Sequence, residues 1–333
     1  IADPGDYMRT VLYTGTDSSR SVTGVGFKPD MVWIKSRSTN YWHQVFDTIR
    51  GPGNRLYTNE TEAEDYRDIT LRSFDNNGFS IGDDDGGINN GGDTYVAWCW
   101  KAGGAAVSNT DGDLTSQVSV NQDAGFSIVE FTGQGGSSSA TVGHGLGKKP
   151  AFWIYKPYTN TSNWYMYHQS LGASAWLTFT TSQASTGNTA AWGGVEPTST
   201  VLTHGAGLVN QGSCILYAWA EIEGYSKFGS FSGNSSTNGV FVYTGHRPAF
   251  VMIKRTDSTG NWVMHDNARN STNPAKGYLL ANSSGVEEAG SDILDFLSNG
   301  FKIRNSWTDI NASGGSYVFA SFAESPFQYA NSK

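Results

Sequence analysis

Three stretches of the chain repeat one pattern of apolar and polar positions. Each has a basic residue before a proline, then a run of apolar residues, then a lysine six residues after the proline. The stretches are GFKPDMVWIK (26–35), GKKPAFWIYK (147–156) and GHRPAFVMIK (245–254). Proline lacks a backbone N–H, so it belongs at the first residue of a strand or on an edge. Because the apolar run does not alternate with polar residues, we expect Pro29, Pro150 and Pro248 each to start a central strand that is covered on both faces.

The surroundings of the three runs repeat as well. An aromatic–hydroxyl–glycine step precedes each run, a tryptophan follows each lysine (Trp42, Trp164 and Trp262), and each repeat ends in a second apolar segment. Asn-Gly steps at 77–78 and 299–300 predict tight hairpins. Short aromatic segments between Gly, Ser, Thr and Asn indicate strands and turns, so the fold is predicted to be all-β. The aromatic residues of the closing segments are expected in the core; they are Trp100, Trp219 and Phe322.

The repeat divides the 333 residues into three segments. We predict three tandem homologous β-sandwich domains of a lectin-like or jelly-roll-like kind, with a barrel as the alternative packing. The first covers residues 1–104 with a short N-terminal arm, the second covers 105–223, and the third covers 224–333. The small polar residues of 103–123 are expected to form a linker or a surface excursion. Each repeat is long enough to bury a core of its own.

Charge and composition narrow the classes of function. The net charge is −8 without a basic cluster, which argues against nucleic-acid binding. No apolar run approaches the length of about 20 residues that a membrane span requires. Cys99 and Cys214 lie in different repeats and are expected to be buried free thiols. The chain starts at Ile1 without a signal-peptide apolar core, as expected of a processed form or a piece of a longer chain.

No catalytic motif is present. The sequence lacks GxSxG and HExxH, and no cofactor is predicted. Glu221 and Glu223 have the spacing of two carboxylates on one sheet face, which a glycosidase would need. The acidic run Asp83, Asp84 and Asp85 is a weak candidate for calcium, because its spacing is contiguous rather than alternating. We therefore expect a protein that is not an enzyme.

The repeated lysines are expected at solvated strand ends, where their stems pack and their ammonium groups reach water. We predict that Lys35 approaches Asp47 and that Lys254 approaches Asp266, because each acid follows at a similar distance along its repeat. Exposed pairs of this kind stabilise a fold by only about 0–1 kcal/mol.

The loops after the three lysines are the candidate binding surfaces. They occupy the same place in each repeat, at 37–43, 157–164 and 255–262, and they combine aromatic, amide and charged side chains. Loops on a rigid sandwich are common binding surfaces, and these groups suit a carbohydrate. The alternative is a set of ordinary polar connections with one core tryptophan each. The candidate ligand-binding residues are Arg37, Asn40, Tyr41, Tyr158, Asn160, Asn163, Arg255, Asp257 and Asn261.

Several of these motifs resemble a repeated β domain of tailed-bacteriophage tail-fibre and virion surface proteins. The resemblance rests on segments such as GFKPDMVWIKSRS, DTYVAWCWKAGG, RPAFVMIKRTDSTGNWVMHD and INASGGSYVFASFAE, and it covers most of the first and third repeats. The second repeat diverges, with His168 where the others have Asp. The resemblance implies a component of the virion surface with a lectin-like sandwich and supplies no catalytic residue.

The resemblance predicts a tail-fibre or appendage protein that binds host surface polysaccharide without cleaving it. Its expected partners are other virion proteins and that polysaccharide, and a homo-oligomer is expected, with a trimer as the first guess. Two alternatives stay open at this point. One is a purely structural capsid-decoration or connecting fibre protein, and the other is a polysaccharide-depolymerising tailspike.

Overall fold

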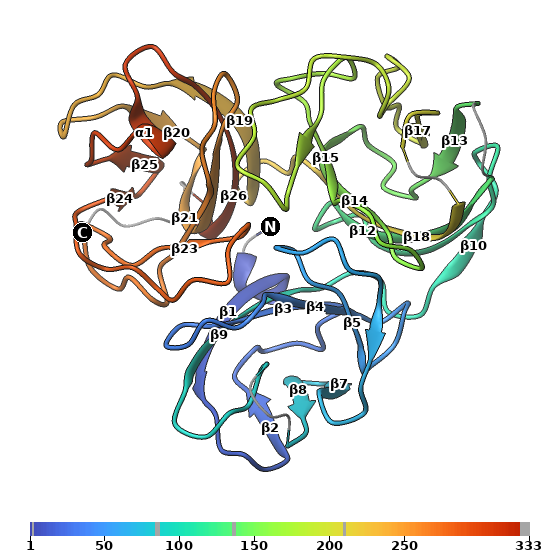
Figure 1. Cartoon of the computed structure of the whole chain (residues 1–333), viewed down its shortest axis with the longest axis horizontal. Helices are drawn as coiled ribbons and strands as arrows, with labels where there is room; N and C mark the ends of the chain where they lie inside the picture. The colour runs from blue at the N-terminus through green and yellow to red at the C-terminus, as the bar shows by residue number, and fades with distance from the viewer. Residues whose placement is uncertain (2, 84–86, 135–137, 209–210, 327–333) are drawn as a thin grey trace.

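The protein is described here by a computed structural model that covers residues 1, 3–83, 87–134, 138–208 and 211–326. Strands dominate these residues, and the helical elements are a 3-10 turn, η1 (Pro4–Asp6), and one short α-helix, α1 (Thr308–Asn311). The strands pair antiparallel in several separate sheets, which confirms the all-β sandwich prediction. Figure 1 shows three lobes around a common centre, and we name them units 1, 2 and 3 in chain order.

Each unit has an inner sheet facing the centre and smaller sheets outside it (Figure 1). The inner sheet of unit 1 has the order β1-β9-β3-β4 (Met8–Thr14, Thr94–Trp100, Met31–Ser36, Gln44–Asp47). The inner sheet of unit 2 has the order β10-β11-β12-β18-β14-β15-β16 (Val107–Asn109, Ser116–Asn121, Phe126–Gln134, Gln211–Ala220, Pro150–Pro157, Tyr165–His168, Leu177–Thr178). That of unit 3 has the order β19-β26-β21-β22-β23 (Ser226–Ser232, Ser316–Pro326, His246–Arg255, Trp262–Asp266, Leu279–Leu280).

The outer sheets are smaller and differ between units. Unit 1 has β2-β8-β7 (Arg20–Thr23, Gly78–Ile81, Leu71–Asp75) and the pair β5-β6 (Asn54–Arg55, Asp65–Tyr66). Unit 2 has β13-β17 (Ala140–Gly143, Val201–His204), and unit 3 has β20-β25-β24 (Phe241–Tyr243, Gly300–Ile303, Leu294–Leu297). The hairpins predicted at 77–78 and 299–300 are β7–β8 and β24–β25. Their glycines are required by close approach: a Cβ on Gly78 would lie 2.0 Å from the carbonyl oxygen of Val22, and one on Gly300 2.1 Å from that of Val242.

The pairing registers align the three copies residue by residue. The central strands β3, β14 and β21 each pair with the closing strand of their own unit. The prediction that a proline starts each central strand is confirmed only for Pro150. Pro150 is the first residue of β14, Pro29 precedes β3 by two residues, and Pro248 lies inside β21 where the register shifts. The equivalent pairs are Met31 with Trp100, Phe152 with Trp219, and Phe250 with Phe322.

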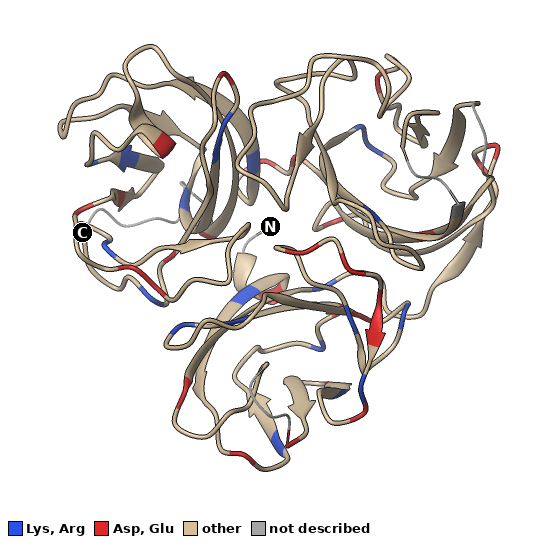
Figure 2. Ribbon diagram, in the orientation of Figure 1, with Lys and Arg blue, Asp and Glu red and all other residues tan. Residues whose placement is uncertain are grey.

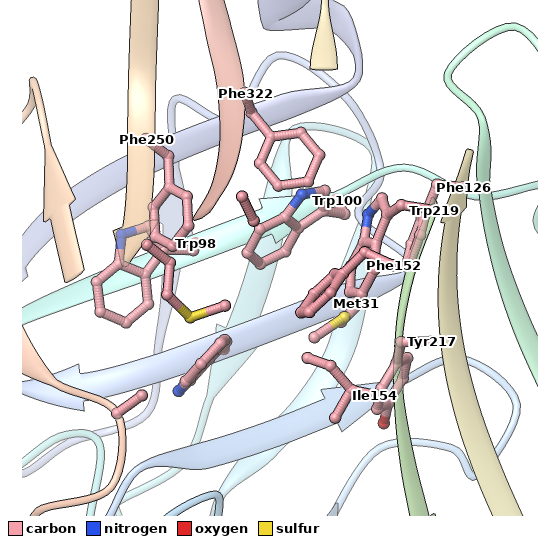
Figure 3. Close-up of a cluster of buried hydrophobic side chains, with 14 of the residues drawn as sticks. Met31, Trp98, Trp100, Phe126, Phe152, Ile154, Tyr217, Trp219, Phe250 and Phe322 are labelled. Atoms are coloured by element: carbon pink, nitrogen blue, oxygen red, sulfur yellow. The ribbon is translucent and has the colours of Figure 1, made fainter. Parts of the chain in front are cut away.

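Both faces of the central strands are buried, as the unbroken apolar runs predicted, but by two different kinds of core. One face packs on the outer sheet of the same unit, giving one apolar cluster in each unit. The other face packs at the centre, in a fourth cluster with residues of all three units (Figure 3). Trp100, Trp219 and Phe322 meet there edge to face, with ring centroids 5.7–6.1 Å apart. Each repeat therefore has a core of its own, but the other face of its central strand is buried in a core that all three units share.

Residues 103–123 were predicted to form a linker or a surface excursion, and they are not a linker. Strands β10 and β11 lie within it and extend the inner sheet of unit 2, pairing onto β12. The residues are small and polar because they form an edge of that sheet, where one face is in solvent. The proposed domain boundaries at 104 and 223 fall between the sheet sets, and the independence of the three domains stays a prediction.

The units contact one another in a cycle. In each unit, a ring N–H donates to a backbone carbonyl of the preceding unit. Unit 2 donates to unit 1, unit 3 donates to unit 2, and unit 1 donates to unit 3. The three contacts are Trp164 Nε1 to Tyr57 O (2.8 Å), Trp262 Nε1 to Thr178 O (2.9 Å) and His43 Nε2 to Leu280 O (3.1 Å). His43 Nδ1 accepts from Trp33 Nε1, which leaves the proton on Nε2.

The prediction of solvated lysines paired with acids is also wrong. Lys35, Lys156 and Lys254 are fully buried, and each ammonium donates to backbone carbonyls. Lys156 bonds Thr61 O of unit 1, and Lys254 bonds Ser182 O of unit 2, so these lysines join neighbouring units. Lys35 bonds Ser36 O at 2.6 Å. The expected acids lie elsewhere because the register places Asp47 opposite Met31 and Asp266 opposite Phe250, four residues from each lysine.

The basic residues and the two cysteines agree with what the sequence predicted. Figure 2 shows the basic residues dispersed over all three lobes rather than gathered on one. Cys99 and Cys214 are buried and free, as predicted. Within the described ranges, no helix is long and apolar enough to cross a membrane.

Candidate functional site

An open hollow of about 650 Å³ lies on unit 1 and includes two of the predicted binding residues, Asn40 and Tyr41, in its lining. Its wall comes from the loop before β4 and from the segment that contains β5 and β6. Because the backbone of this segment is paired, Val45 N to Leu56 O at 2.8 Å and Leu56 N to Val45 O at 3.1 Å, the side chains around it are fixed relative to the inner sheet. The main lining residues are Asn40, Tyr41, Trp42, Arg55, Tyr57, Glu62, Glu64, Asp65 and Arg67.

Trp42 gives the hollow its exposed aromatic surface. Its side chain is 42% exposed, whereas Trp164 and Trp262 are 1% and 2% exposed. The indole packs edge to face on Tyr57, with ring centroids 5.0 Å apart, and the Arg55 guanidinium lies 5.4 Å from the centre of the Tyr57 ring. Burial raises the pKa of Tyr57 to about 12, so its hydroxyl stays protonated.

Charged groups surround this aromatic pair. Asp65 accepts from Arg55 Nη2 at 2.8 Å and from the Tyr57 hydroxyl at 3.3 Å, and Arg67 lies 3.5 Å from the same carboxylate. Burial raises the pKa of the Asp65 carboxyl, but the hydrogen bond and charge of Arg55 outweigh it and hold this pKa below its ordinary value. Glu64 accepts from Arg50 Nη1 at 2.9 Å, yet burial leaves its pKa raised. The hollow thus offers an aromatic face, ionised carboxylate and half-exposed guanidinium.

Of the candidate residues in unit 1, Asn40 and Tyr41 line this hollow and Arg37 does not. Arg37 is bound by the carboxylate of Glu287 in unit 3, and its carbonyl accepts from Glu287 N at 2.9 Å. Its function is therefore at the junction between units 1 and 3.

Most of the candidate residues of units 2 and 3 make their contacts with other side chains of the same chain. Tyr158 is buried and donates its hydroxyl to Glu130, Asn163 accepts from Thr180 at 2.8 Å, and Asn160 is exposed beside Thr159. Arg255 and Asp257 form an ion pair at 2.9 Å, and Asn261 donates to Asp309 at 2.7 Å. The three loops do occupy equivalent places, but each sits against the preceding unit rather than facing solvent alone, as Gly260 N to Ser182 O (2.7 Å) and Ser162 N to Thr61 O (2.8 Å) show.

Sequence reasoning missed Trp42, Arg55, Tyr57, Asp65 and Arg67 as site residues. A signal for Trp42 was present: it follows its lysine by seven residues, whereas Trp164 and Trp262 follow theirs by eight. One residue of shift turns a side chain to the other face of an extended segment. His43, not Trp42, is therefore the equivalent of the two buried tryptophans.

The metal and catalytic candidates are weaker in the structure than in the sequence. Asp83 pairs with Arg72 at 3.4 Å, and Asp84 and Asp85 lie outside the described residues. Across the described part of the chain, no group of three His, Cys, Asp or Glu side chains is placed to hold a metal ion. Glu221 and Glu223 follow the end of β18 rather than sharing a sheet face, and Glu221 is bound by Lys227 at 2.5 Å.

Comparison with curated proteins and with solved structures gave no match. A family model described as "Domain of unknown function (DUF7483)" matches residues 3–326, which include all three units and the central cluster they share. The chain therefore belongs to the DUF7483 family.

Proposed function

We propose that this chain is a bacteriophage virion surface component, part of a tail fibre or similar appendage, that binds a host surface glycan in the unit 1 hollow without cleaving it. The observation that carries the proposal is the exposed indole of Trp42 within a polar, open hollow. The buried junction residues of the three units are His43, Trp164 and Trp262, so packing between the units does not require an aromatic residue at position 42.

The chemistry of the hollow suits a sugar. A sugar ring has an apolar face that can lie on an indole, and its rim of hydroxyls needs hydrogen-bond partners in the same plane. Asn40 and Glu62 are exposed on the rim of the hollow, and the Arg67 side chain is 49% exposed. Arg55 and Asp65 hold each other in place, so the polar wall is preorganised before a ligand arrives.

Binding without cleavage is favoured by the carboxylates. Glycoside hydrolysis needs one protonated acid and one carboxylate on opposite sides of the scissile bond. The raised pKa of Glu64 and the lowered pKa of Asp65 have the right directions for such a pair. Both residues line the hollow, but the Glu64 carboxylate is bound by Arg50 and the Asp65 carboxylate by Arg55, so both carboxylates are already held by arginines of the chain. This leaves the depolymerising tailspike as the weaker alternative.

The virion location and the partners are proposals that rest on the resemblance to tail-fibre domains. One glycan site of this size would bind weakly. Several copies in an oligomeric appendage would raise the apparent affinity by about 10²–10⁴ when geometry allows. A homo-oligomer, with the trimer as first guess, is therefore part of the proposal.

The test compares two exposed aromatic residues. Trp42→Ala and Phe241→Ala remove side chains that are 42% and 44% exposed, one in the hollow and one on β20 of unit 3. Binding to an array of bacterial surface polysaccharides is expected to fall about tenfold or more in the first variant and to stay unchanged in the second. Circular dichroism and thermal melting check that both variants are folded.

Equal binding by wild type and Trp42→Ala, or no binding to any polysaccharide, would contradict the proposal. It would favour the purely structural alternative, which has its own support: most of the candidate loop residues make contacts within the chain. Release of new reducing ends from a bound polysaccharide would instead identify a depolymerase.

A further inference from the structure

A second hollow, on unit 3, occupies the place in the repeat that the first hollow occupies on unit 1. It has a volume of about 350 Å³ and is lined by Tyr278, Glu288, Gly290, Ser291, Ile293, Asn305 and Trp307. We propose that this hollow is a second saccharide site, selective for sugars without negative charge, an inference that rests on the proposed function of unit 1.

The equivalence follows from strand pairing. Arg55 and Tyr278 each directly precede a leucine that pairs with the strand following the central strand, Leu56 with Val45 and Leu279 with Met264. Each is also paired with an acid ten residues later, Arg55 with Asp65 and Tyr278 with Glu288. The other wall comes from the segment after the hairpin. The same sequence offset separates Ile81 from Ile303 and Ile88 from Ile310, and these two pairs bracket that segment in units 1 and 3. Gly87 lies on the first hollow from this segment, and Trp307 lies on the second.

The aromatic surface of the second hollow is a pair of rings. Tyr278 and Trp307 have ring centroids 5.1 Å apart and an interplanar angle of 42°, so together they form a shallow wedge rather than a flat stack. Both rings are only partly buried. A pyranose ring could therefore lie on either aromatic face while its hydroxyls reach the rim.

The backbone holds this wedge in place. Tyr278 N donates to Glu288 O at 2.9 Å, and Glu288 N returns the bond to Tyr278 O at 3.1 Å. Trp307 N donates to Asn305 Oδ1 at 2.8 Å, and the carbonyl of Trp307 accepts from Ile310 N and Asn311 N in the first turn of α1. Rings fixed in this way lose little further freedom when a ligand binds.

The lining charges distinguish the two hollows. The first is lined by two guanidinium groups, Arg55 and Arg67, and by three carboxylates, whereas the lining of the second includes one carboxylate, the exposed Glu288, and no Lys or Arg that could bind an anionic sugar. A carboxylate accepts hydrogen bonds from sugar hydroxyls and repels an anionic sugar such as a uronic acid. The two sites on one chain would therefore differ in the sugars they accept.

The experiment labels the chain with 5-fluorotryptophan and follows ¹⁹F spectra during titration with methyl pyranosides and with methyl glucuronide. The Trp307 and Trp42 signals are assigned from their loss in Trp307→Phe and Trp42→Phe. A saturable shift of the Trp307 signal with a neutral methyl pyranoside, but not with the glucuronide, is expected. In Tyr278→Ala the midpoint of that shift is expected to rise about tenfold.

The control is Tyr243→Ala, which removes an aromatic residue that is 58% exposed on β20 of the same unit. A Trp307 signal that does not move with any neutral sugar, or that moves equally with the glucuronide, overturns the second site. Shifts of the Trp42 signal are read separately, so the first site can stand when the second fails and the second can stand when the first fails.

Discussion

Units 1 and 3 differ from unit 2 at one equivalent position, and the difference shows how each unit is matched to its neighbour. Asp47 of unit 1 accepts from the Tyr217 hydroxyl of unit 2 at 2.7 Å. Asp266 of unit 3 accepts from Trp98 Nε1 of unit 1 at 3.0 Å. In unit 2 the same position is His168, whose Nε2 lies 3.1 Å from the carbonyl oxygen of Phe319 in unit 3.

The facing residue explains the change. Tyr217 and Trp98 occupy equivalent places in their closing strands, opposite Ile154 and Trp33, and both present a donor. Unit 3 has Ala320 at this place, opposite Met252, which leaves the backbone carbonyl next to it as the group to be satisfied. A carbonyl needs a donor, and a neutral histidine supplies one where aspartate cannot.

The supporting residues differ in the same way. Each aspartate is held by an arginine three residues later, Arg50 and Arg269, at 2.6 Å in both cases. After His168 the corresponding residue is Leu171, which packs on the central cluster. Ser170 N donates to His168 Nδ1 at 3.1 Å and so keeps the proton on Nε2. Unit 2 thus presents a donor to the next unit at the position where units 1 and 3 present an acceptor.

Loss of an aspartate should have the largest effect. Asp266→Ala leaves Arg269 and Trp98 Nε1 without their buried partner, and breaking such a pair lowers the free energy of unfolding by about 3–5 kcal/mol. Urea denaturation measures it. The matched variant Asp47→Ala should lose less, because Arg50 keeps Glu64 at 2.9 Å, whereas the remaining acid near Arg269, Glu287, is 3.9 Å away and is already paired with Arg37. Equal losses in the two variants would show that the second acid has no effect.

Conversion of unit 2 to the other type is the next test. His168→Asp places a carboxylate next to the Phe319 carbonyl, where neither group can donate, and the free energy of unfolding should fall by about 1–3 kcal/mol. His168→Asn, which keeps a donor, should lose less.

Adding Leu171→Arg to His168→Asp supplies the missing partner at the position of Arg50 and Arg269. The free energy of unfolding should fall less in the double variant than the sum of the losses in the two single variants. A double-mutant cycle should give a coupling of about 1 kcal/mol. Strict additivity would mean that the Asp–Arg arrangement of units 1 and 3 cannot form in unit 2.

The buried lysines at the junctions should give stability a distinctive dependence on pH. Burial lowers the pKa of Lys156 to about 7 and that of Lys254 to about 8. Because the unfolded chain keeps these lysines protonated up to about pH 10.5, it binds more protons than the folded protein between pH 7 and 10. The free energy of unfolding should therefore rise with pH in this window and lose that gain as pH falls through 7.

Lys156→Met tests this contribution. The variant should show a smaller rise in unfolding free energy between pH 7 and 8, by about 1 kcal/mol, than the wild type. The exposed Lys149→Met is the control and should keep the full rise. An unchanged rise in Lys156→Met would show that the ammonium is not deprotonated in the folded protein.

An exposed pair at the step from unit 2 to unit 3 should matter least. Glu221 and Lys227 are 31% and 38% exposed in their side chains, in contrast to the fully buried Asp266 and Arg269. Glu221→Gln should change the free energy of unfolding by about 0–1 kcal/mol and lose even that in high salt. A loss as large as that of Asp266→Ala would overturn the distinction between buried and exposed pairs.

The amino-acid pattern was sufficient to locate the main strands. Unbroken apolar runs after Pro29, Pro150 and Pro248 identified the central strands, and the aromatic residues of the closing segments, such as Trp100, were assigned to the core. Short-range patterns are enough for this, because strand formation and double-sided burial appear as the spacing of apolar residues along the chain. The same patterns could not distinguish Trp42 from His43, since one residue of offset changes the face that a side chain takes.

The residues that cover each strand face and the partners of the buried polar groups depend on long-range contacts. The contact between Trp98 and Asp266 joins residues 168 positions apart, and that between Tyr217 and Asp47 joins residues 170 apart. No local pattern carries such information. The lysines show the same limit. A lysine at a strand end ordinarily reaches water, but in the folded protein backbone carbonyls satisfy the buried Lys156 and Lys254, and one carbonyl for each comes from the neighbouring unit.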